Sequence, residues 1–337
     1  MNNSDSRYNK FALVREMLET SDVVRKFESG CTVNMAERSK KKRGLFMTGE
    51  GSSRIFPAKR TQFASQRAGS RWPILTEGST QAMEYKLSDF AVFGASNSGQ
   101  TKEVVRLFQQ LKSQNHDAFF SLTANPDTTL EKLALDAHVM NCGKEEAVAA
   151  TKSVIEQGLF YDSLLRNMNG EQMTGLELLA DQIQDALTME IDPELTEIIK
   201  NADMIYFAGK NTGVAEELTL KTNEITRKKS DFLEGTYAVH GIEEVMDKNE
   251  VVIVVEPFES EEEKFTECLV KGVGMPVIAL SSRKTSFPTI RIPDGGQYAD
   301  YVELAAGWNL LVEIGISLGI DLDKPVRARK VGNEYIV

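Results

Sequence analysis

Residues 90–112 read FAVFGASNSGQTKEVVRLFQQLK, and this stretch decides the fold class. It begins with a short apolar run that does not alternate with polar residues, which is typical of a strand buried on both faces of a parallel sheet. A polar turn follows at 94–101, and apolar residues then recur at helical spacing as far as 112. A strand that leads through a polar turn into a helix is the building unit of parallel α/β sheets.

The same alternation of apolar runs and helical segments extends in both directions from this stretch. We expect further strands in two sets, at 44–47, 72–75, 118–122 and 138–140, and at 204–207, 251–255, 277–280 and 289–292. Because the second set resembles the first in length and order, we predict two similar domains rather than one large sheet. The fold class is therefore α/β, with each domain a parallel sheet flanked by helices in a flavodoxin-like three-layer sandwich.

These patterns divide the chain into five segments. The predicted segments are an N-terminal helix (10–29) with a basic linker in 1–43, a first domain at 44–170, a connecting helix in 171–200, a second domain at 201–322 and a C-terminal tail at 323–337. The basic run at 38–43 falls in the predicted linker, and we interpret it as a solvated segment that precedes the first strand.

The composition of the chain limits the classes of function. With 337 residues and a net charge of −11, the chain is long enough for two domains and too acidic for nucleic acid to be the main partner. No run reaches the ~18 apolar residues of a membrane-spanning helix. The cysteines, Cys31, Cys142 and Cys268, are far apart and have no metal-ligand spacing. We therefore expect a cytoplasmic protein with reduced thiols, no nucleic-acid or membrane partner, and no metal or other cofactor.

The polar turn at 94–101 has the groups that an anion site needs. At the start of a helix, the backbone amides have no intrahelical partner and the helix dipole adds positive potential. Ser96, Ser98 and Thr101 add hydroxyl donors, and Gly99 permits close approach of the backbone. Such a cradle binds a phosphate monoester without Lys or Arg, although the same residue types also suit a simple helix cap.

Two other turns bear on this prediction. Ser52 and Ser53 follow the neighbouring predicted strand, where they would add two more hydroxyls at the same edge of the sheet. The corresponding turn of the second set, 256–262, reads EPFESEE and offers carboxylates instead of hydroxyls and glycine. Only the first turn is suited to an anion, so we predict one phosphate site per chain.

A dinucleotide site is an alternative interpretation of the glycines after the first strand. Gly49 and Gly51 would begin the fingerprint, and Glu77 would be the ribose ligand. Arg54 stands where the third glycine of that fingerprint belongs, so the match is incomplete.

The turn at 96–101 resembles the Ser-x-Ser-Gly-x-Thr phosphate loop of the sugar isomerase (SIS) domain family. More specifically, the chain from about residue 44 to the end resembles the isomerase half of the glucosamine-6-phosphate synthases (glutamine–fructose-6-phosphate aminotransferases) and their stand-alone relatives. The sequence GEGSS at 49–53 is similar to the Gly-Cys-Gly-Thr-Ser turn of those proteins. The sequence VAATK at 148–152 is similar to their Val-Ala-Ser-Thr-Lys segment, which closes over the sugar. The resemblance implies that a sugar phosphate is bound by Ser52, Ser53, Ser96, Asn97, Ser98, Thr101, Val148 and Ala150.

The same resemblance implies four catalytic residues. The sequence LKTNEI at 220–225 resembles the family's Leu-Lys-x-Lys-Glu-Ile helix, which implies catalytic roles for Lys221 and Glu224. His240 follows sixteen residues after Glu224, as the ring-opening histidine of the family does. The tail sequence PVRARK at 325–330 resembles the family's Pro-Arg-Asn-Leu-Ala-Lys, whose lysine forms an imine with the ketose, and this implies Lys330.

The residues around Lys221 support an inward position for its side chain. Lys221 falls on an apolar helical stripe with Leu218 and Ile225, so the pattern directs the ammonium into the core. A buried ammonium is stable only when it is paired, and Glu217 and Glu224 are within reach on the same helix. The alternative is an ordinary ion pair on the surface of the helix.

These resemblances imply an isomerase or deaminase that acts on a 6-phosphorylated keto or amino sugar, of the fructose 6-phosphate or glucosamine 6-phosphate type. The family's histidine reaches across from a neighbouring subunit, which implies a homodimer or larger assembly with a shared active site. Asn2 follows Met1 where the synthases have the cysteine of a glutaminase domain, so we expect no ammonia from glutamine by that route. The alternatives are an aldose–ketose isomerase of another sugar phosphate and a non-catalytic phosphosugar sensor.

Overall fold

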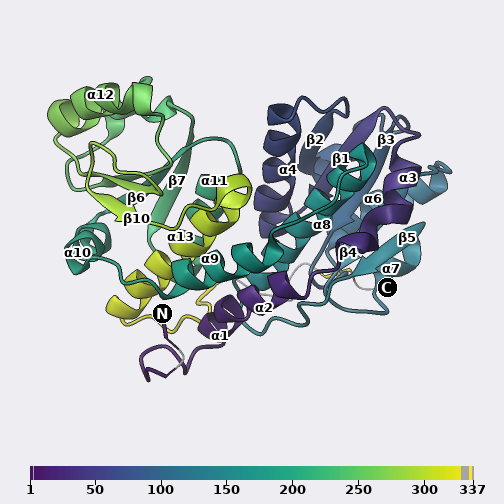
Figure 1. Cartoon of the computed structure of the whole chain (residues 1–337), viewed down its shortest axis with the longest axis horizontal. Coiled ribbons are helices and arrows are strands. Elements are labelled where there is room, and N and C mark those ends of the chain that lie inside the picture. Colours follow the sequence, from purple (N-terminus) through teal and green to yellow (C-terminus); the bar gives the residue numbers. More distant parts are fainter. Residues whose placement is uncertain (3, 328–333, 336–337) are drawn as a thin grey trace. The chain divides into compact units, whose positions relative to one another are not determined.

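The computed structural model describes residues 1–2, 4–327 and 334–335 (Figure 1). They form two compact units, each with one five-stranded sheet. The first-sheet unit consists of Asp22–Glu145, Ala150–Glu177 and the described part of Arg327–Val337. The second-sheet unit consists of Met1–Ser21, Glu146–Ala149 and Leu178–Val326.

The first sheet is parallel throughout. Its strands in spatial order are β2 (Ile74–Gly78), β1 (Gly44–Gly49), β3 (Phe90–Ala95), β4 (Phe119–Thr123) and β5 (Asp136–Val139). The helices of this part of the chain are α3 (Val33–Ser39), α4 (Ile55–Arg67), α5 (Ser79–Ala82), α6 (Lys102–Ser113), α7 (Thr129–Leu133) and α8 (Lys152–Asn169), with 3-10 turns η1 (Ser29–Thr32) and η2 (Gly51–Ser53).

The second sheet is also parallel. Its strands in spatial order are β10 (Thr289–Arg291), β9 (Val277–Ser281), β8 (Val251–Val255), β6 (Met204–Gly209) and β7 (Lys229–Glu234). The helices of this part are α1 (Ala12–Leu18), α10 (Pro193–Asn201), α11 (Val214–Ile225), α12 (Glu262–Phe265), the π-helix η6 (Thr266–Val273) and α13 (Ala299–Ser317), with 3-10 turns η3 (Tyr237–Val239), η4 (Ile242–Val245), η5 (Glu259–Glu261) and η7 (Gly296–Tyr298). Helices α2 (Thr20–Arg25) and α9 (Leu176–Thr188) contain residues of both units.

The two sheets have the same strand order. When the strands are numbered along the chain within each sheet, both follow the order 2-1-3-4-5, one of the common orders of doubly wound α/β sheets. The predicted pair of parallel sheets flanked by helices is therefore confirmed. The equal order also makes β3 and β8 equivalent strands, so the turns that follow them occupy equivalent places in the two sheets.

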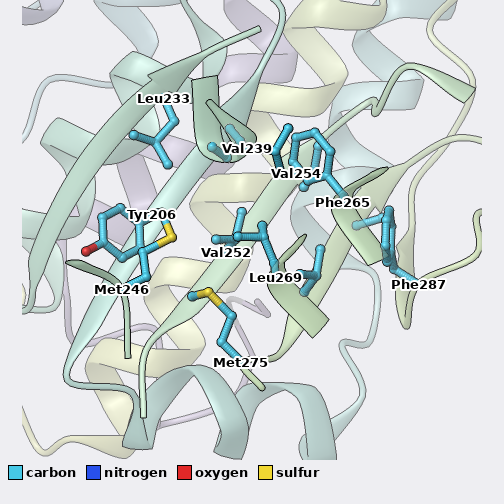
Figure 2. Packing of buried hydrophobic residues seen from close by; sticks show 14 residues of the cluster. Tyr206, Leu233, Val239, Met246, Val252, Val254, Phe265, Leu269, Met275 and Phe287 are labelled. Carbon is cyan, nitrogen blue, oxygen red and sulfur yellow. The ribbon is translucent and has the colours of Figure 1, made fainter. Parts of the chain in front are cut away.

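Burial of apolar side chains explains why these segments form strands. All five residues of β8 are buried, as expected for a strand covered on both faces. Val252 and Val254 pack with Leu269 and other side chains in the cluster shown in Figure 2. In the first sheet, the ring of Phe93 lies against that of Phe120, with the ring centroids 4.9 Å apart.

Strand β7 was absent from the predicted strands. Its sequence, KSDFLE, is mostly polar, and within it only Leu233 is buried. β7 lies at the edge of the sheet and pairs with β6 alone. The faces of an edge strand are less covered than those of a central strand, so its sequence needs fewer apolar residues. Sequence periodicity therefore misses it, whereas the adjacent buried strand carries a clear apolar signal.

The predicted basic linker is wrong. Residues 33–39 form helix α3, which buries Met35 and Ala36. The guanidinium of Arg38 lies 5.0 Å from the centre of the Phe120 ring, and Lys42 Nζ donates to the carbonyl of Ser88 at 2.6 Å. Basic side chains with long apolar stems cover the sheet here, so part of the basic run is packed rather than solvated.

The other N-terminal prediction needs a smaller correction. The helix expected at 10–29 is divided into α1 and α2, and the second of these ends at Arg25. Within the described residues, no helix combines the length and the apolar character needed to cross a membrane.

Candidate functional site

The turn between β3 and α6 gathers three hydroxyls at the start of a 12-residue helix. Thr101 is the residue that precedes the helix, and its Oγ1 lies 2.7 Å from Ser96 Oγ. The amide of Gly99 donates to Ser96 Oγ at 3.1 Å, and the amide of Gln100 donates to Ser98 Oγ at 3.2 Å. The hydroxyls of Ser96 and Thr101 therefore lie together directly before the helix, and helix N-termini are places where proteins bind phosphate.

Gly99 has a specific steric reason to be glycine. Its φ is +64°, and a Cβ built on it would lie 2.4 Å from the side chain of Thr128. Thr128 is itself fixed, because its hydroxyl accepts from the amide of Glu131 in a capping box at the start of α7. Packing against α7, and not only approach to a ligand, therefore requires glycine in this loop.

The turn after β1 lies at the same edge of the sheet. β1 and β3 are neighbours in parallel register, with Thr48 opposite Gly94, so the segments after both strands leave the sheet together. Ser52 and Ser53 lie in η2 directly after β1, and Ser52 is buried. The structure thus places Ser52, Ser53, Ser96, Asn97, Ser98 and Thr101 at the carboxyl edge of one sheet.

Asn97 is held by the protein rather than left open. Its Nδ2 donates to Glu145 Oε2 at 2.6 Å and to Ser153 Oγ at 2.9 Å. Ala150 belongs to the same unit, just before Thr151, the residue that precedes α8, whereas Val148 belongs to the second-sheet unit. Sequence reasoning did not single out Glu145 and Ser153.

Lys221 lies at the centre of a buried charge cluster on α11. Its side chain is fully buried, and its Nζ is 2.8 Å from Glu224 Oε2 and 3.3 Å from Glu217 Oε1. The predicted inward direction is confirmed, and the alternative of a surface ion pair is wrong. Burial by itself lowers the pKa of Lys221, but the neighbouring carboxylates of Glu224 and Glu217 outweigh it and raise that pKa above its ordinary value. The ammonium is therefore charged at neutral pH.

The two carboxylates around Lys221 differ in exposure. The side chain of Glu217 is 0% exposed, whereas that of Glu224 keeps 23% of its surface accessible. Glu217 therefore neutralises the ammonium within the core. Glu224 combines contact with a fixed positive charge and access to the outside, which is what a carboxylate that exchanges protons with a ligand needs.

The remaining catalytic candidates are not joined to this cluster. His240 is exposed on the loop after β7, and its Nε2 lies 3.2 Å from Lys264 Nζ. No contact described for the chain links His240 to Lys221 or Glu224. Lys330 lies outside the described residues. Among the residues that the structure covers, no group of three or more His, Cys, Asp or Glu side chains is arranged to hold a metal ion.

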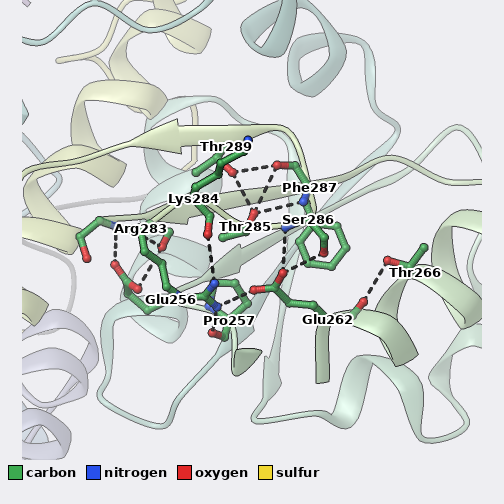
Figure 3. Close-up of polar contacts among 12 residues, drawn as sticks. Glu256, Pro257, Glu262, Thr266, Arg283, Lys284, Thr285, Ser286, Phe287 and Thr289 are labelled. Carbon is green, nitrogen blue, oxygen red and sulfur yellow. Dashed lines mark hydrogen bonds and ion pairs between the residues drawn. The ribbon is translucent and has the colours of Figure 1, made fainter. Parts of the chain in front are cut away.

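The turn after β8 is the equivalent place in the second sheet, and Figure 3 shows that carboxylates occupy it. Glu262 is buried and accepts from the amide and the hydroxyl of Ser286, both at 2.8 Å, and it also pairs with Arg283. Glu256 accepts from Ser281 Oγ at 3.0 Å. The carboxylates of this turn thus accept from donors at the end of β9 and in the segment after it, as the acidic sequence of the turn leads one to expect.

Comparison with protein families identifies the part of the chain that holds the hydroxyl-rich turn. Residues 76–166 match the family model of the SIS domain. The resemblance noted in the sequence is therefore confirmed for the segment that contains Ser96, Asn97, Ser98 and Thr101. No curated protein sequence matches the chain.

Solved structures resemble the chain over nearly its whole length. The C-terminal domain of the glucosamine-fructose-6-phosphate aminotransferase of Francisella tularensis has a TM-score of 0.76 and 19% identity, with 94% of this chain and 98% of that chain covered. The glucosamine-6-phosphate deaminase of Thermotoga maritima has a TM-score of 0.73 and 19% identity, covering 96% and 99%. The tagatose-6-phosphate ketose/aldose isomerase of Escherichia coli has a TM-score of 0.78 and 17% identity, also covering 96% and 99%. At these identities the likeness establishes a shared fold.

The SIS match does not include every candidate residue. It contains the turn after β3 together with Glu145, Ala150 and Ser153, whereas Ser52 and Ser53 precede it. Lys221, Glu224 and His240 lie in the second-sheet unit, beyond the matched residues.

Proposed function

We propose that the chain is a phosphosugar isomerase or deaminase that transfers a proton between C1 and C2 of a 6-phosphorylated keto or amino sugar. The observation that carries this proposal is the buried Lys221, held 2.8 Å from a carboxylate of Glu224 that remains accessible. A protein that only senses a sugar phosphate needs the phosphate loop but has no use for a buried ammonium beside an accessible carboxylate. Such a pair is costly to bury, so a catalytic role accounts for it better than a structural one.

The candidate residues of the two units have separate tasks in this proposal. The hydroxyls of Ser96, Ser98 and Thr101 and the amides at the start of α6 bind the phosphate, and Ser52 and Ser53 add donors from the next turn. The segment around Val148 and Ala150 contacts the sugar. These assignments follow the SIS phosphate loop and the convergence of donors at the carboxyl edge of the first sheet.

The chemistry needs one base that can both take and return a proton. Glu224 removes the proton from one carbon of the open-chain sugar and delivers it to the next, while the ammonium of Lys221 lies 2.8 Å from its Oε2 and holds it in place. His240 exchanges a proton between the ring oxygen and O1 when the sugar opens. Lys330 forms an imine with the open-chain carbonyl of a ketose.

An amino-sugar phosphate would undergo the same proton transfer, followed by hydrolysis. After ring opening, transfer of the proton by Glu224 converts the C2 amine into an imine. Water then adds to C2, and ammonia leaves to give the ketose phosphate. If the substrate has no amine, the same proton transfer is a plain aldose–ketose isomerisation. Among the structures of similar fold, one has the name of a glucosamine-6-phosphate deaminase and another that of a ketose/aldose isomerase, and this proposal unites both reactions.

Four further predictions from the sequence belong to the same proposal. We propose domain boundaries at 44–170 and 201–322, a flavodoxin-like sandwich for each domain, and a homodimer or larger assembly in which His240 acts in a neighbouring subunit. We also propose that the protein works in the cytoplasm, since Cys31, Cys142 and Cys268 are all free thiols in the structure.

The test is to incubate pure protein with glucosamine 6-phosphate and follow ammonia and fructose 6-phosphate with coupled enzymes. A parallel set of aldose and ketose phosphates is monitored for interconversion by NMR. Ammonia release supports the deaminase, and interconversion alone supports the isomerase. Binding of a sugar phosphate without turnover favours a sensor, and absence of binding and turnover for every sugar phosphate overturns the proposal.

A further inference from the structure

Glu145 is a buried carboxylate that the proposed reaction does not use. It is 1% exposed and lies in the segment between β5 and α8. A carboxylate in such a place is tolerated only when hydrogen-bond donors compensate its charge. The identity of those donors shows what Glu145 holds together.

One oxygen of Glu145 faces the start of α8. Oε1 accepts from the amide of Thr151 at 2.7 Å, from Thr151 Oγ1 at 3.1 Å and from the amide of Ser153 at 3.4 Å. These amides belong to the residue before α8 and to its first turn, where backbone donors lack intrahelical partners and negative charge is stabilised. Glu145 is therefore fixed by an 18-residue helix, independently of the phosphate loop.

The other oxygen faces the phosphate loop. Oε2 accepts from Asn97 Nδ2 at 2.6 Å and from Ser153 Oγ at 2.6 Å. Asn97 Nδ2 also donates to Ser153 Oγ at 2.9 Å, so the three side chains form a closed triangle. Asn97 stands between Ser96 and Ser98, and it is the only side chain of the loop with a described bond to Glu145.

The backbone of Asn97 is held as well. Its carbonyl accepts from the amide of Ala124 at 3.0 Å and from Asn125 Nδ2 at 3.0 Å. The segment after β4 thus fixes one side of the residue, and Glu145 fixes the other. Asn97 is therefore held at both its backbone and its side chain, between the two serines of the loop.

We propose that Glu145 is a positioning residue of the phosphate site, which acts through Asn97. By anchoring the Asn97 amide to the start of α8, it keeps Ser96 and Ser98 in the conformation in which their hydroxyls and the α6 amides meet the phosphate. The inference rests on the proposed phosphate binding and changes one assignment within it. Asn97 shapes the loop by its side chain instead of donating to the ligand.

A carboxylate suits this position because the described groups that bond to it are all donors. Asn97 Nδ2 and Ser153 Oγ point at one oxygen, and the donors at the start of α8 point at the other. In Glu145→Gln, the remaining carbonyl oxygen can satisfy α8, but the new amide group then faces the amide of Asn97, donor against donor. Exchanging the partner residue as well, in Glu145→Gln/Asn97→Asp, restores one donor and one acceptor across this contact.

The experiment measures binding of glucosamine 6-phosphate and of inorganic phosphate to the full chain by titration calorimetry. We expect Glu145→Gln and Asn97→Asp each to weaken binding by about tenfold or more. The double variant should bind more tightly than either single variant, because the contact is complementary again. Glu156→Gln is the matched control. Glu156 is also 1% exposed and accepts hydrogen bonds from the backbone amides of Asn141 and Cys142, but no described contact joins it to the phosphate loop. The affinity of Glu156→Gln for both probes should therefore stay within about twofold of wild type.

Circular dichroism and thermal melts check that each variant folds. If Glu145→Gln does not fold, Asn97→Ala removes the link to the loop while Glu145 still caps α8, and a several-fold loss of affinity is then expected. If wild type binds the probes and Glu145→Gln or Asn97→Ala binds equally well, the positioning role alone is overturned. A double variant that is no better than the worse single variant also contradicts it. If wild type binds neither probe, the phosphate site itself is wrong and the inference falls with it.

Discussion

The turns after β3 and β8 occupy equivalent places in sheets of the same strand order, yet they carry side chains of opposite character. The turn after β3 presents the hydroxyls of Ser96, Ser98 and Thr101 at the start of a 12-residue helix. The turn after β8 presents Glu262, which takes the donors of Ser286 and Arg283 for itself. The carboxyl edge of a parallel sheet concentrates donors in both cases, and the residue types decide whether those donors serve an external anion or an internal one.

The helices that follow the two turns also differ. α6 runs unbroken from Lys102 to Ser113, so its first amides and its dipole are directed at the loop. After β8 the chain forms only the four-residue α12 before it passes into a π-helix. The second sheet thus lacks a regular α-helix of that length at the equivalent point. It contributes instead the buried ammonium of Lys221 on α11.

The prediction with the largest expected effect tests whether phosphate binding and proton transfer depend on different residues. Glu224→Gln keeps the shape of the side chain but removes the base, so exchange of solvent deuterium into the sugar should fall by about 10²–10⁴-fold. Affinity for inorganic phosphate should stay at the wild-type value. Mass spectrometry of the sugar in D₂O measures the exchange, and Glu216→Gln on the same helix is the control. Full exchange in Glu224→Gln would place the base elsewhere.

The second prediction concerns the geometry of the loop. Gly99→Ala places a methyl group 2.4 Å from Thr128 at a φ of +64°, so the loop must shift. The left-handed conformation costs roughly 1–2 kcal/mol and overpacking roughly 1–3 kcal/mol more. Gly143→Ala is a matched control, because its φ is +70° but nothing lies within 4 Å of the new Cβ. Thermal melts and phosphate titrations should therefore show a larger loss for Gly99→Ala. Equal losses would mean that the contact with Thr128 is unimportant.

The third prediction removes one hydroxyl from the turn after β3 and one from the turn after β8. Ser98→Ala should raise the Michaelis constant, because one charge-assisted hydrogen bond contributes roughly 1.5–3 kcal/mol. Ser260→Ala removes the hydroxyl of the equivalent acidic turn and should leave the constant unchanged. Steady-state kinetics with a sugar phosphate, or phosphate titration, measures both. A larger effect at Ser260 would reverse the assignment of the two turns.

Part of this comparison could be made from the sequence. Apolar runs placed β3 and β8 correctly, and the residues after them distinguished the two turns, because strands buried on both faces and polar turns leave local signals. Lys221 was also placed inward, since its apolar helical stripe is a local pattern as well. Where the signal is local and strong, sequence reasoning is sufficient.

Other features depend on contacts that no local pattern contains. The contact between Asn97 and Glu145 joins residues 48 positions apart, and a glutamate within the charged run 144–146 of a loop looks like any exposed charge. β7 was missed because an edge strand needs only one buried residue, Leu233. α3 was missed because basic residues near its end suggested a solvated linker, although their stems pack on the sheet.

The smallest expected effect is on stability and depends on pH. Burial by itself raises the pKa of Glu262, but the hydrogen bonds from Ser286 and the charge of Arg283 outweigh it, so the folded-state pKa lies below the ordinary 4.5. The unfolded chain therefore binds the proton more readily. The stabilisation from this carboxylate is complete above pH 4.5 and is lost as the pH falls through the folded-state pKa.

Glu262→Gln should consequently lower the free energy of unfolding by roughly 1–3 kcal/mol at pH 7, and the difference from wild type should shrink below about pH 4. Denaturant titrations at both pH values measure it, and the exposed neighbour Glu263 gives the control Glu263→Gln, which should behave like wild type. A difference that stays constant with pH would show that the charge of Glu262 is not what its donors stabilise. Glu262→Ala sharpens the comparison further, because it frees Arg283 and Ser286. If this variant gains a second phosphate site by calorimetry, the acidic turn is an anion site that the chain fills with its own carboxylate.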